Sequence, residues 1–424
     1  NPSSKRRMSP RARFASAVAK AATWASRASG RGAGGMIGGL IAQKLDPGIL
    51  GQLGGGRPAV IVTGTNGKST TTRMLAAALR AAGQSVATND GGDNMDAGVI
   101  SALMASPGAD SLVLEVDELH VAHISADLKP RALVLLNLSR DQLDRVGEIN
   151  KIEASLRAAV DANPQATIVA NCDDPLIASA AWDARNVVWV SAGGGWTNDA
   201  TSCPRTGGPI IRDGDDWHAV KPLADGSRFA RPTPAWRIGA DGVATPYGST
   251  LPMNLKLPGD ANRGNATLAM AAAVEMGAEA IDALGAVEQV DSVAGRYSTI
   301  SVGDHEVRML LAKNPAGWQE ALSMVDRSAD GLVIAVNGQV ADGEDLSWLW
   351  DVRFEDFEGL AVKAAGERGT DLAVRLTYAD ISHELIPDPL KAILACPTGR
   401  IEVLANYTAF RDLKAALQKE TTRG

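Results

Sequence analysis

Apolar residues along most of the chain fall into short uninterrupted runs, separated by longer segments in which they recur every three or four positions. The short runs lie at residues 60–62, 86–87, 111–116, 132–136 and 167–170. Such runs are typical of strands buried on both faces, and the segments between them of amphipathic helices. Strands that alternate with helices predict an α/β fold with a mostly parallel sheet, whose ligands bind at the carboxyl ends of the strands.

The alternation stops between residues 191 and 257. This stretch is rich in Gly, Pro and Trp and has short β-type segments at 208–212 and 217–220, so it predicts a small β-rich insertion. A long Ala-rich helix is then expected to about Met276. Further strands are expected near residues 298–302, 307–311, 332–336, 372–376 and 401–405.

The first 45 residues carry nine Lys or Arg residues and no acidic residue before Asp46. A helix is expected from Phe14 to Ser26, followed by a glycine-rich linker that ends near Gly54. Two interpretations of this basic arm stay open: a solvated helix that docks on the body of the protein, or a helix weakly attracted to an anionic membrane surface. The arm lacks the apolar core of a signal peptide, and no stretch of the sequence has the length of a membrane span.

These patterns divide the chain into an arm and linker (1–53), a central domain (54–299) that contains the insertion at 191–257, and a C-terminal α/β domain (300–424). The formal net charge of −7 argues against a dedicated nucleic-acid-binding protein. Three widely spaced cysteines suggest no disulfide framework, so a reducing cytosol is the simplest compartment.

The segment from Val60 to Leu75 has the pattern of a phosphate-binding loop. A β-branched run ends at Gly64, Thr65-Asn66-Gly67 follows, and Lys68-Ser69-Thr70 opens a helix. Glycines let backbone N–H groups surround phosphate oxygens, the lysine adds a full charge, and the serine offers a hydroxyl to Mg²⁺. The usual pattern would place a glycine at Val62, and a glycine-rich turn without a ligand is the alternative.

Polar residues follow two of the other predicted strands. Glu115 lies at the end of its strand in E-V-D-E, and Asn137 follows its strand in N-L-S-R-D-Q-L-D-R. A carboxylate near a phosphate loop suits Mg²⁺, which takes one or two protein carboxylates besides phosphate oxygens and water. The alternative for Glu115 is an acid that complements a helix dipole.

Three candidates lie farther along the chain. Asn262 and Asn265 are one helical turn apart, where their amides can bind a base or ribose, or simply cap the helix. Arg296 can reach nucleotide phosphates or pair with an acid. The loops at 313–317 and 337–351 follow predicted strands, and the second combines tryptophans with carboxylates. Loops on a rigid sheet favour function, although an Asp helix cap is a rival interpretation.

The insertion contains C-P-R-T-G-G at 203–208. The pattern C-P-x-C-G-G would be half of a zinc ribbon, but Thr206 occupies the second ligand position. A structural zinc site needs four protein ligands, and Cys203 with His218 cannot supply them. We therefore predict no zinc, with the hairpin held by packing alone.

Taken together, these motifs resemble the MurT family, the Mur-ligase-like subunits of lipid II isoglutaminyl synthases, over nearly the whole chain. The motifs that carry the resemblance are T-G-T-N-G-K-S-T (63–70), E-V-D-E (115–118), N-L-S-R-D-Q-L-D-R (137–145), G-D-A-N-R-G-N (259–265), K-N-P-A-G (313–317) and D-L-S-W-L-W-D (345–351). The resemblance implies a Mur-ligase-like central P-loop domain and a MurT-type C-terminal domain. Family members often carry four zinc-binding cysteines in the insertion, of which this chain keeps Cys203 alone.

The resemblance also implies roles for individual residues. The loop Gly64–Thr70 would bind ATP, with Lys68 on the β- and γ-phosphates and Ser69 and Glu115 on Mg²⁺. Asn262 would lie near adenine, Arg296 near ribose or phosphate, and Asp351 would match the family's essential C-terminal acid. Classical Mur ligases often have a histidine where this chain has Gln142, so a second Mg²⁺ is not expected.

The implied reaction is ATP-dependent amidation of the α-carboxylate of D-isoglutamate in the lipid II stem peptide through an acyl phosphate. No cysteine has the surroundings of a glutaminase nucleophile, so ammonia would come from a separate glutaminase subunit of the GatD type. The enzyme would work in the cytoplasm at the inner face of the plasma membrane. One alternative is a stand-alone ligase of the Mur or folylpolyglutamate type that adds an amino acid, and a second is a nucleotide-binding scaffold that has lost its catalytic activity.

Overall fold

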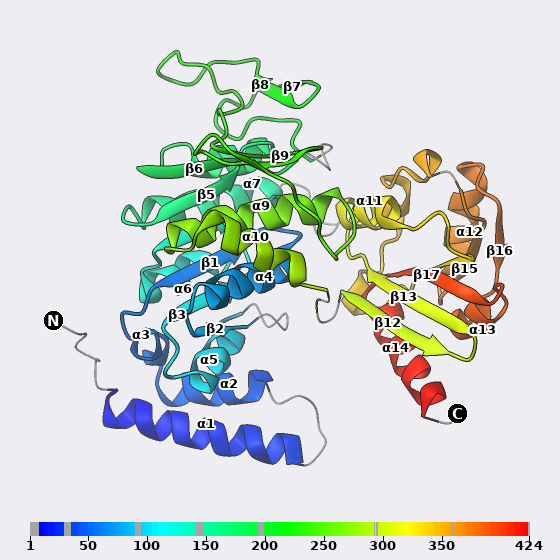
Figure 1. Ribbon diagram of the computed structural model, residues 1–424, viewed down its shortest axis with the longest axis horizontal. Coiled ribbons are helices and arrows are strands. Elements are labelled where there is room, and N and C mark those ends of the chain that lie inside the picture. Colours follow the sequence, from blue (N-terminus) through cyan, green and yellow to red (C-terminus); the bar gives the residue numbers. More distant parts are fainter. Residues whose placement is uncertain are drawn as a thin grey trace. The chain divides into compact units, whose positions relative to one another are not determined.

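The computed structural model describes residues 8–28, 35–89, 95–140, 148–193, 199–291, 293, 296–357 and 359–422. The chain forms two compact units (Figure 1). Unit 1 comprises Asn1–Ser139 and Glu148–Asp291, and unit 2 comprises Arg140–Gly147 and Ser292–Gly424.

The described residues of unit 1 form a sheet of nine strands in the order β11-β10-β9-β6-β5-β4-β1-β3-β2. Neighbouring strands from β2 to β9 are parallel, and β10 and β11 extend one edge antiparallel. All side chains of β1, β3 and β4 are buried, which explains their uninterrupted apolar runs. The strands are β1 (Ala59–Thr63), β2 (Val86–Thr88), β3 (Ser111–Glu115), β4 (Ala132–Leu135), β5 (Thr167–Asn171), β6 (Asn186–Ser191), β9 (Trp236–Gly239), β10 (Gly242–Ala244) and β11 (Thr250–Leu251).

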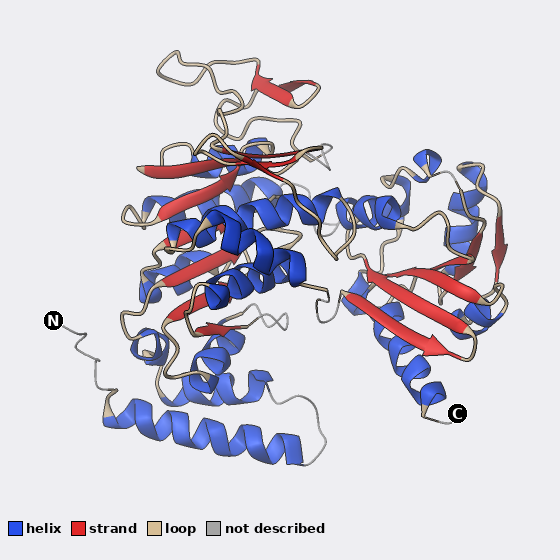
Figure 2. Cartoon of the chain, viewed as in Figure 1, coloured by secondary structure: helices blue, strands red, loops and turns tan. Residues whose placement is uncertain are grey.

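Helices cover both faces of this sheet (Figure 2). Helices α4, α9 and α10 pack together on one face, and α5 to α8 lie on the other. The helices are α4 (Lys68–Ala81), α5 (Asp96–Ala105), α6 (Val121–Leu128), α7 (Glu148–Asp161), α8 (Pro175–Ala181), α9 (Asp260–Glu275) and α10 (Ala280–Gln289). The register pairs Val62 with Glu115 and Thr63 with Leu135, so the polar residues that follow these strands emerge at one edge of the sheet.

The N-terminal region is more regular than the sequence predicted. The expected helix is α1 (Pro10–Ala28), but the expected linker contains α2 (Gly35–Leu45) and α3 (Ile49–Gly54). The glycines that suggested a linker allow close packing instead. A Cβ on Gly38 would lie 2.3 Å from Thr23 Oγ1, and one on Gly39 would lie 1.9 Å from the carbonyl oxygen of Ala97.

The insertion contains a separate hairpin of β7 (Ile210–Asp213) and β8 (Asp216–Ala219), as predicted. Its second half returns to the main sheet through β9, β10 and β11. The insertion is therefore β-rich, but part of it extends the sheet of unit 1.

The described residues of unit 2 form a sheet of six strands in the order β12-β13-β17-β14-β15-β16, antiparallel between β12 and β13 and parallel elsewhere. The strands are β12 (Tyr297–Val302), β13 (His305–Leu311), β14 (Gly331–Ala335), β15 (Val362–Ala365), β16 (His383–Leu385) and β17 (Gly399–Ala405). The helices are α11 (Pro315–Met324), α12 (Gly369–Tyr378), α13 (Pro389–Leu394) and α14 (Tyr407–Thr421), with 3-10 turns η1 (Val340–Asp342), η2 (Ser347–Trp350) and η3 (Phe354–Asp356).

One expected strand of unit 2 was wrong. Residues 372–376 belong to helix α12. The strand of this part of the chain is β15, which lies before α12 and between β14 and β16 in the sheet. Leu372 and Leu376 are both buried and are spaced by one helical turn, so the apolar pattern here was helical. The remaining predicted strands and the α/β class are confirmed. Among the described residues, no helix has the length and apolar character needed to span a membrane.

Candidate active site

The phosphate-loop segment begins where β1 ends and closes at the N-terminus of α4. Gly64 and Gly67 have φ values of 146° and 89°, which favour glycine. A Cβ on Gly67 would approach Asn265 Oδ1 to 2.6 Å, and one on Gly64 would approach Leu136 Cβ to 2.8 Å. Both positions therefore require glycine for conformation and for space. Gly67 is also the N-cap of α4, where helix geometry directs backbone N–H groups outward.

Lys68 is buried, and its ammonium lies against the loop. Its Nζ donates to the carbonyl oxygens of Gly64 (2.6 Å) and Thr65 (3.3 Å). It also lies 3.6 Å from Oε1 of Glu118, a buried carboxylate. The sequence pattern assigns no role to Glu118, although it ends the E-V-D-E motif. Its negative charge balances the lysine in the structure, so a bound phosphate would compete with it for Lys68.

Ser69 and Glu115 meet at the other side of the loop. Ser69 Oγ donates to Glu115 Oε2 at 2.9 Å, and both side chains are buried. Asn89, directly after β2, exchanges two hydrogen bonds with the backbone of Glu115, at 2.7 and 2.8 Å. Glu115 thus lies at the end of β3, and Asn89, which follows the neighbouring strand β2, holds its backbone in place.

A second asparagine clamps the loop itself. Asn137 Oδ1 accepts from the N–H of Asn66 (2.9 Å), and Asn137 Nδ2 donates to its carbonyl oxygen (2.8 Å). Ser139 adds an N–H bond to Thr65 Oγ1 at 2.9 Å. The segment 137–139 therefore determines the shape of the loop. Asn89 directly follows β2, and Asn137 lies two residues after β4. The sequence singled out Asn137 by its position after a strand, and the same signal could have identified Asn89.

Lys68, Ser69 and Glu115 suit a nucleoside triphosphate bound with Mg²⁺. Mg²⁺ shared with phosphate needs one or two protein ligands, and the adjacent hydroxyl of Ser69 and carboxylate of Glu115 offer such a pair. Among the described residues, no group of three or more His, Cys, Asp or Glu side chains could hold a metal ion. A magnesium site here would therefore depend on phosphate oxygens and water for its remaining ligands.

The start of α9 packs against the phosphate loop through Asn265, and the side chain of Asn262 is buried. It is 1% exposed, its Nδ2 donates to Pro258 O at 2.7 Å, and its Oδ1 accepts from Asn265 Nδ2 at 3.3 Å. Asn262 thus bonds within the first turn of α9, whose N-cap residue is Gly259, while Asn265 lies against Gly67. Contact of Asn262 with adenine stays a prediction.

Asp351 lies in unit 2, directly after the 3-10 turn η2. Its carboxylate is about a third exposed and lies 3.6 Å from Nη2 of Arg140, which belongs to the same unit. Trp348 of η2 is buried and stacks on Trp318 of α11, with ring centroids 5.4 Å apart. The acid is thus presented at the surface by a segment that buries a tryptophan.

Arg375 of α12 holds the segment around Asp351 in place through hydrogen bonds on both sides of it. The buried guanidinium donates to Leu349 O (2.9 Å) and Val352 O (2.7 Å), and binds the carboxylate of Glu355. It also lies over the rings of Trp350 and Phe354. One arginine therefore spans both sides of Asp351. Sequence reasoning missed it, because residues 372–376 were assigned to a strand.

Arg296 also lies in unit 2, just before β12. Burial raises the pKa of Glu320 on α11 to about 7, and the charge of Arg296 lowers it. The alternative that Arg296 interacts with an acid thus has support, and its role near ribose or phosphate stays a prediction. Gln142 lies outside the described residues, so the expectation about a second Mg²⁺ stays a prediction as well.

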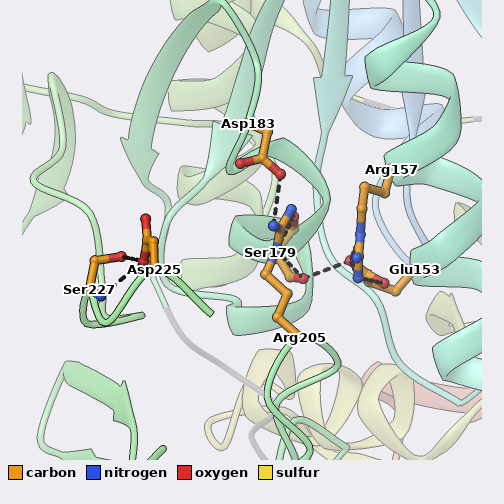
Figure 3. Close-up of polar contacts among 7 residues, drawn as sticks. All are labelled: Glu153, Arg157, Ser179, Asp183, Arg205, Asp225 and Ser227. Atoms are coloured by element: carbon orange, nitrogen blue, oxygen red, sulfur yellow. Dashed lines mark hydrogen bonds and ion pairs between the residues drawn. The ribbon is translucent and has the colours of Figure 1, made fainter. Parts of the chain in front are cut away.

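The turn that carries Cys203 joins the insertion to the rest of unit 1 through Arg205. Arg205 donates to Asp183 Oδ2 (2.7 Å) and to Oγ and the carbonyl oxygen of Ser179, and Ser179 in turn donates to Glu153 (Figure 3). Cys203 is buried with Trp217 and Phe229 in a small apolar cluster. The hairpin thus combines packing with an arginine contact. That no zinc binds here stays a prediction.

The other two cysteines are buried thiols. Burial, together with the neighbouring Asp173, raises the pKa of Cys172 to about 12, and burial raises the pKa of Cys396. Since the thiolate is the nucleophile, both surroundings disfavour nucleophilic chemistry.

Comparison with known proteins gives two family matches. The Mur ligase middle domain matches residues 62–273, half of the chain, and the MurT ligase C-terminal domain matches residues 311–410. The first match contains the phosphate loop, Glu115 and Asn262. The second contains Asp351 and Arg375.

Relatives and solved structures agree with these matches. The chain is 29% identical over 420 residues to the lipid II isoglutaminyl synthase (glutamine-hydrolyzing) subunit MurT of Streptococcus pneumoniae, covering 91% of this chain and 94% of that protein. It is 29% identical over 434 residues to the subunit of the same name from Staphylococcus aureus, covering 96% and 98%. A pseudomurein peptide ligase type C from Methanothermus fervidus has a similar fold, with a TM-score of 0.65 at 18% identity over 86% of this chain and 79% of that one. The chain therefore belongs to the Mur ligase family, in its MurT branch.

Proposed function

We propose that this chain is the ligase subunit of a glutamine-hydrolysing lipid II isoglutaminyl synthase. It amidates the α-carboxylate of D-isoglutamate in the stem peptide of lipid II, a step of peptidoglycan synthesis. The observation that carries the proposal is the presence in one chain of a complete phosphate loop and a MurT C-terminal domain that contains Asp351. The two MurT relatives, which match over more than nine-tenths of this chain, bear this activity in their names.

The proposed reaction has two steps. The γ-phosphoryl group of ATP passes to an oxygen of the carboxylate, giving an acyl phosphate and ADP. Ammonia then attacks the carbonyl carbon, phosphate leaves, and the nitrogen loses a proton to give the amide. Lys68 neutralises charge on the transferred phosphoryl group from its position on the loop carbonyls. Ser69 and Glu115 would hold Mg²⁺, which when bound neutralises phosphate charge.

Ammonia needs a source and an acceptor for its proton. Free ammonia is mostly protonated at neutral pH, and the partly exposed carboxylate of Asp351 is suited to orient it or to take its proton. The buried thiols of Cys172 and Cys396 are poor nucleophiles, so we assign glutamine hydrolysis to a separate subunit of the GatD type. A lipid-linked acceptor and ATP together place the reaction at the cytoplasmic face of the plasma membrane.

The test is to purify the chain with a GatD-type glutaminase and incubate the complex with lipid II, ATP, Mg²⁺ and glutamine. Mass spectrometry should show replacement of a hydroxyl by an amino group at the D-isoglutamyl residue. Lys68→Ala and Asp351→Asn should lower formation of the product by about 10²-fold or more. Lys151→Ala and Asp356→Asn, which change exposed residues of the same types, should not.

Two results would refute the proposal. Lipid II that stays unmodified in an intact complex argues against amidation. ATP consumption that depends on an added amino acid, with transfer of that amino acid to the acceptor, would identify a stand-alone ligase instead.

A further inference from the structure

Helix α1 is the outermost helix of one side of unit 1, with α2 between it and α5 (Figure 1). It packs through small residues: Ala12, Ala15 and Ala19 are fully buried. Gly38 of α2 approaches Thr23 and Ala19 so closely that a Cβ would collide. This close packing fixes which face of α1 points away from the protein.

The opposite face of α1 is apolar and exposed. Phe14, Ala17, Ala21 and Trp24 follow one another at spacings of three or four residues and form a single line, which we call the apolar stripe. The side chains of Phe14 and Trp24 are 64% and 74% exposed. Large aromatic residues this exposed are costly in water unless another surface covers them.

Basic residues run beside the stripe. Arg13, Lys20 and Arg27 are spaced by seven residues, are all exposed, and form a second line, the basic flank. Helix α1 contains no acidic residue, whereas the chain as a whole carries a net charge of −7. A basic line beside an aromatic and apolar stripe is the arrangement of helices that lie in the plane of an anionic membrane surface.

We propose that the apolar stripe and basic flank of α1 bind an anionic lipid surface, with α1 lying parallel to it. This inference rests on the proposed function, because a lipid-linked acceptor must be reached at a membrane. A symmetric contact with a second copy through this face would bring two basic flanks together, so charge favours an anionic lipid surface. Helix α2, which packs on α1, exposes Met36, Ile37 and Leu40 and provides further apolar surface nearby.

The experiment is flotation of the full chain, in its glutaminase complex, with two kinds of vesicle: phosphatidylcholine alone, and phosphatidylcholine with phosphatidylglycerol. Binding should require phosphatidylglycerol and weaken with salt. Each Lys or Arg at such a surface contributes about a five-fold change in binding, so Arg13→Gln/Lys20→Gln/Arg27→Gln should weaken it by about a hundred-fold. Phe14→Ser/Trp24→Ser should weaken it by about ten-fold or more.

Matched controls separate the surface from charge and aromatic content in general. Lys151→Gln/Arg185→Gln/Lys419→Gln removes three exposed charges elsewhere, and Tyr247→Ser removes an aromatic side chain that is 70% exposed. Both should bind vesicles like the unmodified protein. Every variant should keep its melting temperature and its amidation of a lipid-free stem-peptide acceptor.

Vesicle binding is measured without ATP or acceptor, so it does not depend on the proposed reaction. Binding without any amidation would overturn the proposed function and leave the lipid surface standing. Normal amidation without binding to anionic vesicles, or binding that the α1 variants do not weaken, would overturn the lipid surface. Loss of the glutaminase from the α1 variants would show that the stripe binds the partner subunit, which also overturns it.

Discussion

In unit 1 the candidate nucleotide site is built at the ends of strands that are buried on both faces, whereas in unit 2 Asp351 follows a short 3-10 turn between β14 and β15. Lys68, Ser69 and Glu115 are all buried and bonded to one another or to the loop. Asp351 is about a third exposed, and its segment is held largely by Arg375 and a stacked tryptophan. The difference teaches that the proposed phosphate site is built on the ends of buried strands, while the acid depends largely on one side chain of a neighbouring helix.

In both units, asparagine side chains near strand ends bond the backbone N–H and carbonyl oxygen of a single residue. In unit 1, Asn89 clamps the backbone of Glu115 and Asn137 clamps that of Asn66. In unit 2, Asn406 directly follows β17. Its Oδ1 accepts from the N–H of Asn337, which lies after β14, and its Nδ2 donates to the carbonyl oxygen of Asn337. An asparagine just after a buried parallel strand can satisfy two backbone groups at a sheet edge, where the ladder no longer pairs them.

The largest effects should separate the chemistry of the two units. Lys68→Ala should lower acyl-phosphate formation by about 10³-fold, because charge on the transferred phosphoryl group is no longer neutralised. Asp351→Asn should leave acyl-phosphate formation unchanged but lower amide formation by about 10²- to 10³-fold. Trapping the acyl phosphate with hydroxylamine measures the first step by itself. Equal loss of trapped product in both variants would contradict the division of roles.

Removing Arg375 should break the support of Asp351. Arg375→Ala leaves the carbonyls of Leu349 and Val352 without this donor and should lower the free energy of unfolding by about 2–4 kcal/mol. The rate of amidation should fall while the KM for ATP stays constant. Arg375→Lys keeps the charge without the planar fork and should recover part of the rate.

Arg368→Ala is the matched control, since Arg368 lies at the start of α12 but is partly exposed and bonds Asp371 three residues away. It should change stability by less than about 0.5 kcal/mol. A KM for ATP that rises with Arg375→Ala would show that the segment serves the nucleotide instead.

Glu320 offers a pH test of unit 2. Its pKa is raised from 4.5 to about 7, so the carboxyl is protonated in the folded protein at pH values where it is ionised in the unfolded chain. Its contribution to stability is therefore fully present below about pH 4.5 and is lost as the pH rises through about 7. Glu320→Gln should remove this pH dependence, a difference of up to about 3 kcal/mol. Urea unfolding at a series of pH values measures it, with the exposed Glu306→Gln as control; parallel profiles for wild type and Glu320→Gln would refute it.

The smallest expected effect tests the clamp of the phosphate loop. Asn137→Ala removes both bonds to Asn66 and should cost about 1–2 kcal/mol of stability. The KM for ATP should rise by about ten-fold, because the loop loses the contacts that shape it. Asn163→Ala also removes two buried side-chain bonds in unit 1 but lies away from the loop, between α6 and α7. It should lower stability equally without changing the KM; equal kinetics for the two variants would disprove the clamp.

The sequence by itself determined the α/β class, most of the strands, and the phosphate loop with Ser69 and Glu115, because these follow from local patterns: continuous apolar runs, glycines before a helix, and polar residues at strand ends. Tertiary structure alone decided three things. It made the glycine-rich linker helical, since Gly38 and Gly39 serve packing between helices. It buried Asn262 in the first turn of α9, and it placed Arg375 against the Asp351 segment. Each depends on which surfaces meet across the fold, and residues distant in sequence carry no local pattern that records such a contact.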